Sequence, residues 1–224
     1  MPLCRLLSAM TEATHGIILR TRPLTETSLI VHWLTPELGR LATVAKGARR
    51  PKSPFAGKLD LFYAADFSFV RSRRSELHVL REVSLRETHS GIREDLARLQ
   101  QGGYAAALIE QATETETPLP EIFELARAFF DHLCVALPQP QDIFVLELKL
   151  LRELGLEPDL TATQLTPGGR KIMAALQAGD WNSAARLKLA GSQTAELRQF
   201  LQNFLLYHLG HLPRGRQAAV GERA

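Results

Sequence analysis

The sequence predicts an α+β protein in which a five-stranded OB-type β-barrel at residues 14–85 is followed by an α-helical bundle at residues 90–212. Three observations lead to this prediction. Short runs rich in Val, Ile, Leu, Phe and Thr dominate the first part of the chain. In the second part apolar residues recur every three to four positions, as in amphipathic helices. The charge changes sign between the two parts, which sets them apart chemically as well.

The five predicted strands are short and are separated by turn-forming residues. They cover residues 15–24, 28–35, 40–46, 63–71 and 77–85. In the fourth run Ala65, Phe67 and Phe69 alternate with less apolar neighbours, which is typical of a strand with one buried face. Residues 47–57 contain two glycines and two prolines and therefore predict a long loop between the third and fourth strands.

The helical part is predicted from apolar spacing together with start and stop residues. Helices are expected at residues 91–112, 121–137, 143–154 and 195–209, and at a position opening with Thr166 and Pro167. Asp142 is a good N-cap for the third of these, and Gly102-Gly103 is a weak point in the first.

The two ends of the chain are predicted to carry little structure. Residues 1–13 read as a leader, within which Met10 is an alternative natural start. Residues 213–224 are polar and read as a flexible tail.

The charge of the chain is unevenly distributed. Residues 1–81 hold 13 Lys and Arg and 6 Asp and Glu, a net of +7. Residues 82–224 hold 14 and 18, a net of −4, so the total is +3. Between residues 38 and 58 there are six cations and no acid. This distribution predicts that the front half binds a polyanion.

Composition and motifs exclude several functions. Cys4 and Cys134 are too few for a disulfide scaffold or a four-cysteine zinc module. The longest apolar stretches are far too short to cross a membrane, so we expect a cytoplasmic protein. The sequence contains no Walker A, GxGxxG or HExxH motif. Scattered histidines and linker acids such as Glu114 and Glu116 form no catalytic set, so we expect a binding protein without cofactor or metal.

The cations of the predicted barrel are the candidate nucleic-acid contacts, because Lys and Arg neutralise phosphates. The candidates are Arg20, Arg22, Arg40, Lys46, Arg49, Arg50, Lys52, Lys58, Arg71, Arg73 and Arg74. Among the aromatic residues, Phe55 in the long loop is a candidate for stacking on a base, and the alternative is that it pins the loop to the barrel. Trp33 fits either face of its strand.

Several stretches resemble the bacterial RecO family of DNA repair proteins. They are Thr-Glu-Thr-Ser at 25–28, Thr-Pro-Glu-x-Gly at 35–39, and Val-Ala-Lys-Gly-Ala-Arg at 44–49 followed by Ser53. In the helical part Glu147, Leu150-Leu151 and Leu154-Gly155 are similar to the family's Phe-Glu-x-x-Leu-Leu-x-x-Leu-Gly stretch, with Leu146 in place of the phenylalanine. Tyr-His-Leu-Gly at 207–210 resembles its last helix.

This resemblance implies a recombination mediator that is not an enzyme. Such a protein binds single-stranded and double-stranded DNA and anneals complementary strands. It engages the acidic C-terminal tail of the single-stranded DNA-binding protein SSB and, with RecR, helps to load RecA in the RecF pathway. The partners implied are therefore DNA, SSB and RecR, and less directly RecA and RecF. The family's basic OB surface corresponds to Lys46, Arg49, Arg50 and Lys52.

Many family members carry a four-cysteine zinc site after the Leu-Gly-x-x-Pro segment. Residues 161–169 occupy that place here and contain no cysteine, so we expect the zinc-binding insertion to be absent. The mediator function does not depend on it, because that site is structural.

A tail of acidic residues that ends in a hydrophobic residue needs an apolar groove with cations at its rim. Phe144, Leu148, Lys149 and Arg152 lie on one predicted helix and are the candidate SSB-tail groove. The alternative is that Leu148 and Leu151 belong to the core and the two cations are ordinary surface residues.

Two other functions remain open at this point. One is an RNA-binding OB module whose helical part is a protein-docking platform, because phosphate contacts are common to DNA and RNA. The other is a nuclease whose carboxylates come from distant segments.

Overall fold

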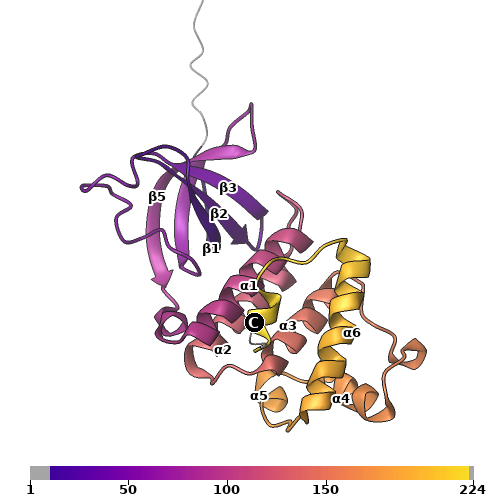
Figure 1. Cartoon of the computed structure of the whole chain (residues 1–224). Coiled ribbons are helices and arrows are strands. Elements are labelled where there is room, and N and C mark those ends of the chain that lie inside the picture. The colour runs from indigo at the N-terminus through magenta and orange to yellow at the C-terminus, as the bar shows by residue number, and fades with distance from the viewer. Residues whose placement is uncertain (1–10, 222–224) are drawn as a thin grey trace, which may run out of the picture. The chain divides into compact units, whose positions relative to one another are not determined.

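A computed structural model describes residues 11–221 of the chain. It divides into two compact units (Figure 1). Of the described residues, the barrel unit comprises those through Thr88 together with Thr115–Pro120, and the helical unit comprises His89–Glu114 and those from Glu121 onward. The two predicted domains differ from this division mainly because a short segment from within the helical sequence, Thr115–Pro120, belongs to the barrel unit.

The five predicted strands are all present and close a barrel, which confirms the OB-type architecture. They are β1 (Thr11–Pro23), β2 (Leu29–Thr35), β3 (Gly39–Ala45), β4 (Ala64–Val70) and β5 (Leu77–Glu87). The order around the barrel is β1-β2-β3-β5-β4, and β1 pairs with both β2 and β4. The contact between β3 and β5 is parallel, and the other neighbours are antiparallel. Residues 11–13 pair with β4, so the predicted leader is wrong for these three, and residues 1–10 lie outside the described part.

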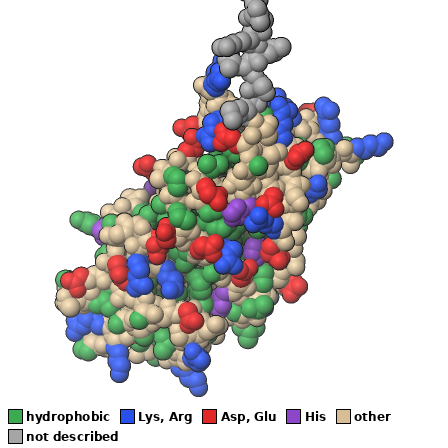
Figure 2. Space-filling view, turned by 180° about the vertical axis from the view of Figure 1, so that it is seen from behind, with side chains coloured by type: hydrophobic (Ala, Val, Ile, Leu, Met, Phe, Trp, Pro, Cys, Tyr) green, Lys and Arg blue, Asp and Glu red, His purple; other side chains and the backbone are tan. Residues whose placement is uncertain are grey.

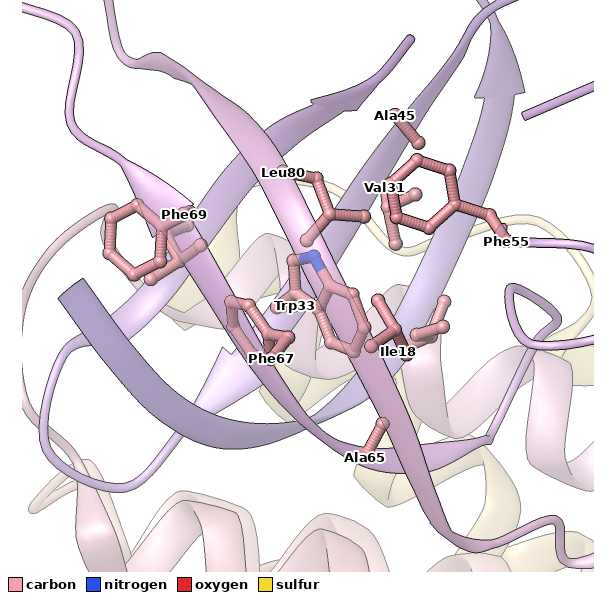
Figure 3. Packing of buried hydrophobic residues seen from close by; sticks show 11 residues of the cluster. Ile18, Val31, Trp33, Ala45, Phe55, Ala65, Phe67, Phe69 and Leu80 are labelled. Atoms are coloured by element: carbon pink, nitrogen blue, oxygen red, sulfur yellow. The ribbon is translucent and has the colours of Figure 1, made fainter. Parts of the chain in front are cut away.

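The interior of the barrel is built from large aromatic side chains (Figure 3). Ala65, Phe67 and Phe69 face inward as their alternation predicts. Trp33 is fully buried, and its ring stacks on Phe67 at a centroid distance of 4.0 Å. Its indole Nε1 donates a hydrogen bond of 2.9 Å to the hydroxyl of Thr43, so the one polar atom of the ring is satisfied within the core.

Thr115–Pro120, here called the strap, packs along the start of β3. Thr115 forms a parallel bridge with Arg40, and the backbone nitrogen of Glu116 donates a 2.7 Å hydrogen bond to the Arg40 carbonyl. A side chain at Gly39 would place its Cβ 1.9 Å from the carbonyl oxygen of Thr117. Gly39 also has a φ of +66°, so this position requires glycine for two reasons, its backbone conformation and the close approach of the strap.

The helical unit contains seven α-helices among the described residues. They are α1 (Leu96–Ala112), α2 (Pro120–Val135), α3 (Pro140–Glu153), α4 (Pro167–Ala178), α5 (Trp181–Ala184), α6 (Gly191–Leu209) and α7 (Arg216–Ala219). Two 3-10 turns, Ser90–Glu94 and Leu160–Ala162, precede α1 and α4. Pro120 is both the last residue of the strap and the first residue of α2, so the strap leads directly into that helix.

The start of each helix tests the predicted caps. Thr166 caps α4 as predicted, with its hydroxyl accepting a hydrogen bond from the Gly169 nitrogen. Asp142 is not an N-cap but the third residue of α3, where it completes a capping box with Gln139. The predicted helix at 91–112 begins later, because Asp95 caps α1. That helix runs through the two glycines without a break.

The predicted flexible tail is wrong for the described residues 213–221. Arg216 is only 5% exposed and forms an ion pair with the fully buried Glu147, with N–O distances of 2.7 and 2.8 Å. The hydroxyl of Tyr104 donates a third hydrogen bond, of 2.6 Å, to the same carboxylate. Burial alone would lower the pKa of Arg216, but the Glu147 carboxylate raises it above its usual range. This contact therefore fastens α7 to α1 and α3.

Within the described residues, no helix is both long and apolar enough to span a membrane.

Candidate nucleic-acid interface

The long loop between β3 and β4 carries the densest positive charge of the barrel. Its first part, residues 46–58, is here called the basic loop. The loop is fastened at its base to the β1–β2 turn, because Gly47 donates to the hydroxyl of Ser28 and the backbone nitrogen of Arg49 donates to the carbonyl of Thr27. The Arg49 guanidinium adds a 3.3 Å hydrogen bond to the carbonyl of Thr25. The cations of the basic loop are thus presented from an anchored segment.

Phe55 lies in the barrel core and not on the surface. It is only 7% exposed and belongs to the same apolar cluster as Val31 and Ala45 (Figure 3). A ring in this position pins the basic loop and offers no face to a base, so the stacking hypothesis for Phe55 is wrong and its alternative is confirmed. Trp33 is excluded from base stacking for the same reason.

The cations of the basic loop have no acidic partners among the described residues 11–221. Lys46, Arg49, Arg50 and Lys52 are exposed, and Lys58 is half-buried. In the space-filling view, long Lys and Arg side chains project from the barrel unit at the upper right (Figure 2). Cations that lack carboxylate partners and stand in water are suited to neutralising phosphates.

Arg20, Arg22 and Arg40 extend this positive surface onto the strands. Arg20 and Arg22 are exposed and two residues apart on β1, so they lie on one face of that strand. Arg22 is next to the β1–β2 turn on which the basic loop is anchored. Arg40 is half-buried at the start of β3, beside the strap.

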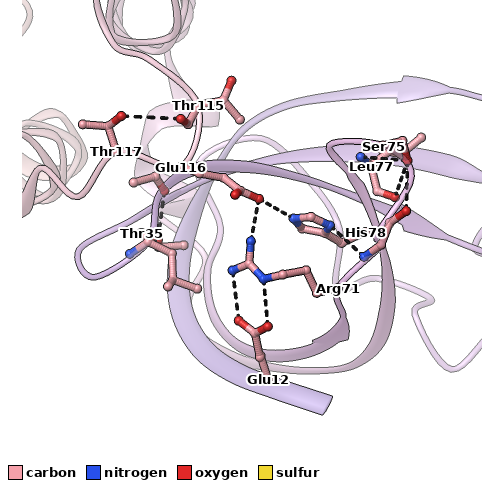
Figure 4. A network of polar contacts seen from close by, with 12 residues as sticks. Glu12, Thr35, Arg71, Ser75, Leu77, His78, Thr115, Glu116 and Thr117 are labelled. Atoms are coloured by element: carbon pink, nitrogen blue, oxygen red, sulfur yellow. Dashed lines mark hydrogen bonds and ion pairs between the residues drawn. The ribbon is translucent and has the colours of Figure 1, made fainter. Parts of the chain in front are cut away.

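The turn between β4 and β5, residues 71–76, is here called the arginine turn, and its three arginines have different environments. Arg73 and Arg74 are exposed on the turn itself. Arg71 is held by two carboxylates (Figure 4). Its Nε and one terminal nitrogen donate to Glu12 at 2.8 and 3.0 Å, and its other terminal nitrogen donates to Glu116 of the strap at 2.7 Å.

These ion pairs change the expected role of Arg71. The hydrogen bond with Glu12 raises the pKa of Arg71 and lowers that of Glu12, which is the signature of a mutually stabilising pair. Arg71 stays a predicted DNA contact, and in the free protein two carboxylates occupy its guanidinium. Arg73 and Arg74 remain candidates as exposed cations of this turn.

His78 completes this group from β5. Its Nε2 donates a hydrogen bond of 2.7 Å to the same Glu116 oxygen that Arg71 contacts. Its Nδ1 accepts a hydrogen bond from the Ser72 backbone nitrogen, so the proton of a neutral ring resides on Nε2. Sequence reasoning missed both His78 and Glu116. The only available signal was the acidic composition of the segment 114–116, which is not specific for a position in space.

A hollow of about 950 Å³ lies elsewhere on the barrel unit, between β1, β4, β5 and the basic loop. Lys58 and Arg81 line it together with acids, including Glu37 and Glu82. Because charges of both signs meet there, it is less suited to a polyanion than the exposed part of the basic loop.

The predicted SSB-tail groove is not formed as expected. Phe144 and Leu148 are buried in the helical unit, at 0% and 1% exposure, so neither can line a surface groove. Leu151 is also buried, which supports the alternative that these residues belong to the core. Lys149 is half-buried, and Arg152 forms an ion pair with Glu157 at 2.6 Å.

Residues 161–169, where we expect no zinc-binding insertion, contain no Cys, His, Asp or Glu. Residues 161–169 contain the end of a 3-10 turn and the start of α4. In the part of the chain that the structure describes, no group of three or more His, Cys, Asp or Glu residues could hold a metal ion.

Comparisons with known proteins agree with this architecture. Residues 10–89 match the family described as "Recombination protein O N terminal", and residues 93–164 match "Recombination protein O C terminal". These two ranges correspond closely to the barrel and to the first part of the helical unit.

Several proteins named "DNA repair protein RecO" are similar to this chain. The one from Rhodopirellula baltica is 34% identical over 143 residues, which span 64% of this chain and 53% of that relative. The one from Bacillus subtilis is 32% identical over 151 residues, spanning 67% and 58% of the two chains. The one from Anaeromyxobacter sp. (strain K) is 29% identical over 229 residues, spanning 87% and 90%.

The matched segment thus covers about half of the Rhodopirellula relative and nine tenths of the Anaeromyxobacter one. Both halves of the chain match the corresponding family descriptions, in the order in which the barrel and the helices occur. The chain belongs to the RecO family of DNA repair proteins.

Proposed function

We propose that this protein is a recombination mediator that binds single-stranded and double-stranded DNA and anneals complementary strands. The observation that carries the proposal is the basic loop, an anchored segment with exposed cations. Within the described residues these cations have no acidic partners. Membership of a DNA repair family supports DNA as the polyanion. The protein acts by binding and positioning strands, and we assign it no catalytic step.

Annealing by such a surface has a simple electrostatic basis. Two complementary strands repel each other through their phosphates, and a cationic loop that neutralises some of them lowers this repulsion. Because the contacts are to phosphates, binding is expected to depend little on sequence and strongly on salt.

The wider role includes protein partners. With RecR, the protein helps to load RecA onto strands coated with SSB in the RecF pathway, in the cytoplasm at the nucleoid. The resemblance to RecO supports these partners.

The acidic tail of SSB binds the helical unit, for which Lys149 and Arg152 on α3 are the candidate cations. A titration with an SSB-tail peptide tests this: the double variant Lys149→Glu, Arg152→Glu should bind it more weakly, and undiminished affinity would remove these two residues from the contact.

The main experiment measures annealing of complementary labelled oligonucleotides over a salt series, with and without SSB. The test variant changes Lys46, Arg49, Arg50 and Lys52 to Glu. The matched control makes the same change of charge in the helical unit, at Arg170, Lys171, Arg186 and Lys188. We expect the test variant to bind single strands about 100-fold more weakly, and its salt slope to fall by about 3, because up to four phosphate contacts are lost.

The control variant should lose far less affinity than the test variant, with circular dichroism unchanged in both. Equal losses in the two variants would show that net charge matters and the basic loop does not. A wild-type protein that neither binds nor anneals DNA at low salt would contradict the proposed function. A clear preference for structured RNA in competition would favour the RNA-binding alternative.

A further inference from the structure

Arg71 and His78 converge on a single oxygen atom. The Arg71 terminal nitrogen and the His78 Nε2 each lie 2.7 Å from the same Glu116 carboxylate oxygen (Figure 4). Two N–H donors directed at one anionic oxygen are also the arrangement that binds a phosphate oxygen. The Glu116 side chain therefore occupies a site whose chemistry suits a phosphodiester.

The two donors are held in place without Glu116. Glu12 fixes the other edge of the Arg71 guanidinium, which also lies over the ring of Phe69 at 5.7 Å. The His78 ring stacks on the same phenylalanine at 5.3 Å and accepts the hydrogen bond from Ser72. Because these contacts come from the barrel strands and the arginine turn, the site keeps its shape when its present occupant leaves.

The Glu116 side chain is held less firmly than the two donors, Arg71 and His78. The Glu116 side chain is 39% exposed, so water and salt reach its ion pairs. Its backbone has a φ of +56°, a left-handed conformation that is uncommon for residues other than glycine. One backbone hydrogen bond and one bridge, both to Arg40, add to the attachment of the strap.

The site also lies next to the cations of the proposed interface. Arg73 and Arg74 follow Arg71 on the arginine turn and are exposed. A strand bound along this turn would bring its phosphates to the position of the Glu116 carboxylate. Glu12 stays paired with Arg71 and neutralises part of its charge, so the site supplies one phosphate contact and not several.

We propose that Arg71 and His78 form a binding site for a backbone phosphate of DNA, and that Glu116 of the strap occupies this site as a phosphate mimic until DNA displaces it. This inference rests on the proposed function, because it requires that the barrel binds DNA. The strap thereby screens part of the positive surface in the free protein.

The test compares two single substitutions that remove one negative charge each. Glu116→Gln keeps an oxygen that accepts from Arg71 and His78, so the fold should be retained while the charge that competes with phosphate is lost. Glu114→Gln is the matched control, because Glu114 is exposed two residues earlier. Binding of fluorescein-labelled oligo(dT) is measured for the wild type and both variants over a salt series.

We expect Glu116→Gln to bind oligo(dT) about threefold more tightly at low salt and its salt slope to steepen by about 0.7, the value for one further contact to a single strand. Glu114→Gln should keep the wild-type slope. Adding Arg71→Gln to Glu116→Gln should abolish the gain. Equal gains in the two single variants, or no gain in Glu116→Gln, would overturn the inference while leaving the proposed function intact.

A second measurement uses the wild-type protein and does not depend on any variant. A glutamate-specific protease cleaves after Glu116 only when the strap is released, so oligo(dT) should accelerate cleavage at this position. Protection of Glu116 by oligo(dT) would overturn the inference. Failure of every variant and of the wild type to bind oligo(dT) would contradict the proposed function, and the phosphate site with it.

Discussion

Each unit of the protein contains a glutamate that receives hydrogen bonds from an arginine and from one other side chain. In the helical unit Glu147 accepts hydrogen bonds from Arg216 and Tyr104. In the barrel unit Glu116 accepts hydrogen bonds from Arg71 and His78. Both contacts fasten a segment that is remote in sequence. The difference is exposure: the Glu147 side chain is 0% exposed and that of Glu116 is 39% exposed.

This difference separates a permanent fastening from an exchangeable one. Removing one partner from a buried pair leaves a charge without water or counter-charge, which is strongly unfavourable. At a half-exposed pair, water and salt replace the lost partner at little cost. The same chemistry therefore holds the C-terminal helix α7 in the core, yet allows the strap to give way to another anion.

The largest effect is expected from Arg216→Ala. The variant leaves the Glu147 carboxylate buried without its cation and should reduce the free energy of unfolding by about 3–5 kcal/mol. Urea unfolding measures this, with the exposed Arg214→Ala as control, which should change it by less than about 0.5 kcal/mol. A loss below about 1 kcal/mol for Arg216→Ala would mean that α7 is not fastened by this pair.

Tyr104→Phe should have the second largest effect. It removes one hydrogen bond of 2.6 Å to a buried carboxylate while keeping the ring, so a loss of about 1.5–3 kcal/mol is expected. Tyr207→Phe is the matched control, because Tyr207 is 84% exposed, and it should leave the unfolding midpoint unchanged. Equal midpoints for the two variants would show that the Tyr104 hydroxyl contributes nothing to the pair.

Glu116→Gln should cost less than about 1 kcal/mol of stability, because its ion pairs are half-exposed. The cost should shrink further at high salt, whereas the cost of Arg216→Ala should not. Urea unfolding of both variants at low and high salt tests the contrast. A salt-independent loss of several kcal/mol at Glu116 would make the strap a permanent fastening like α7.

The smallest effect concerns how the stability of the protein changes in acid. The hydrogen bond from Arg71 lowers the pKa of Glu12 below its usual 4.5, so the folded state binds this proton less readily than the unfolded state. The resulting stabilisation is present above the unfolded pKa and is lost as the pH falls through the folded pKa. The unfolding midpoints of wild type and Glu12→Gln should therefore differ at neutral pH and converge in acid. A difference that persists unchanged in acid would assign it to another cause.

Local patterns predicted the elements well, because each depends on neighbours in sequence. The alternation at 65, 67 and 69 identified β4, and the cap and proline at 166–167 located the start of α4. Helix starts were less exact where two residues could cap. Asp142 had the right chemistry for an N-cap, but Pro140 allowed the helix to begin three residues after Leu137, with Gln139 as its cap.

The long-range contacts could not be predicted from pattern. Glu147 is a charged residue in an otherwise apolar stretch of its helix, which shows that it needs a partner but not which one. By local composition Arg216 lies in a polar tail and Glu116 in a polar linker. The basic local sequence of Arg71 gives no sign of its acidic partners, which lie 59 and 45 residues away. Charge counted along the sequence therefore overestimates the charge that a surface presents.

The pairing of Glu147 with Arg216 also has a consequence for synthesis of the chain. The two residues are 69 positions apart, so at ordinary translation rates Arg216 is added roughly 3–14 s after Glu147. During that interval the nascent helices hold a carboxylate whose cation does not yet exist, and their core cannot close around it. The helical unit is thus expected to complete its folding only after its C-terminal helix has left the ribosome, and a product cut short before residue 216 should be a preferred target of cellular proteases.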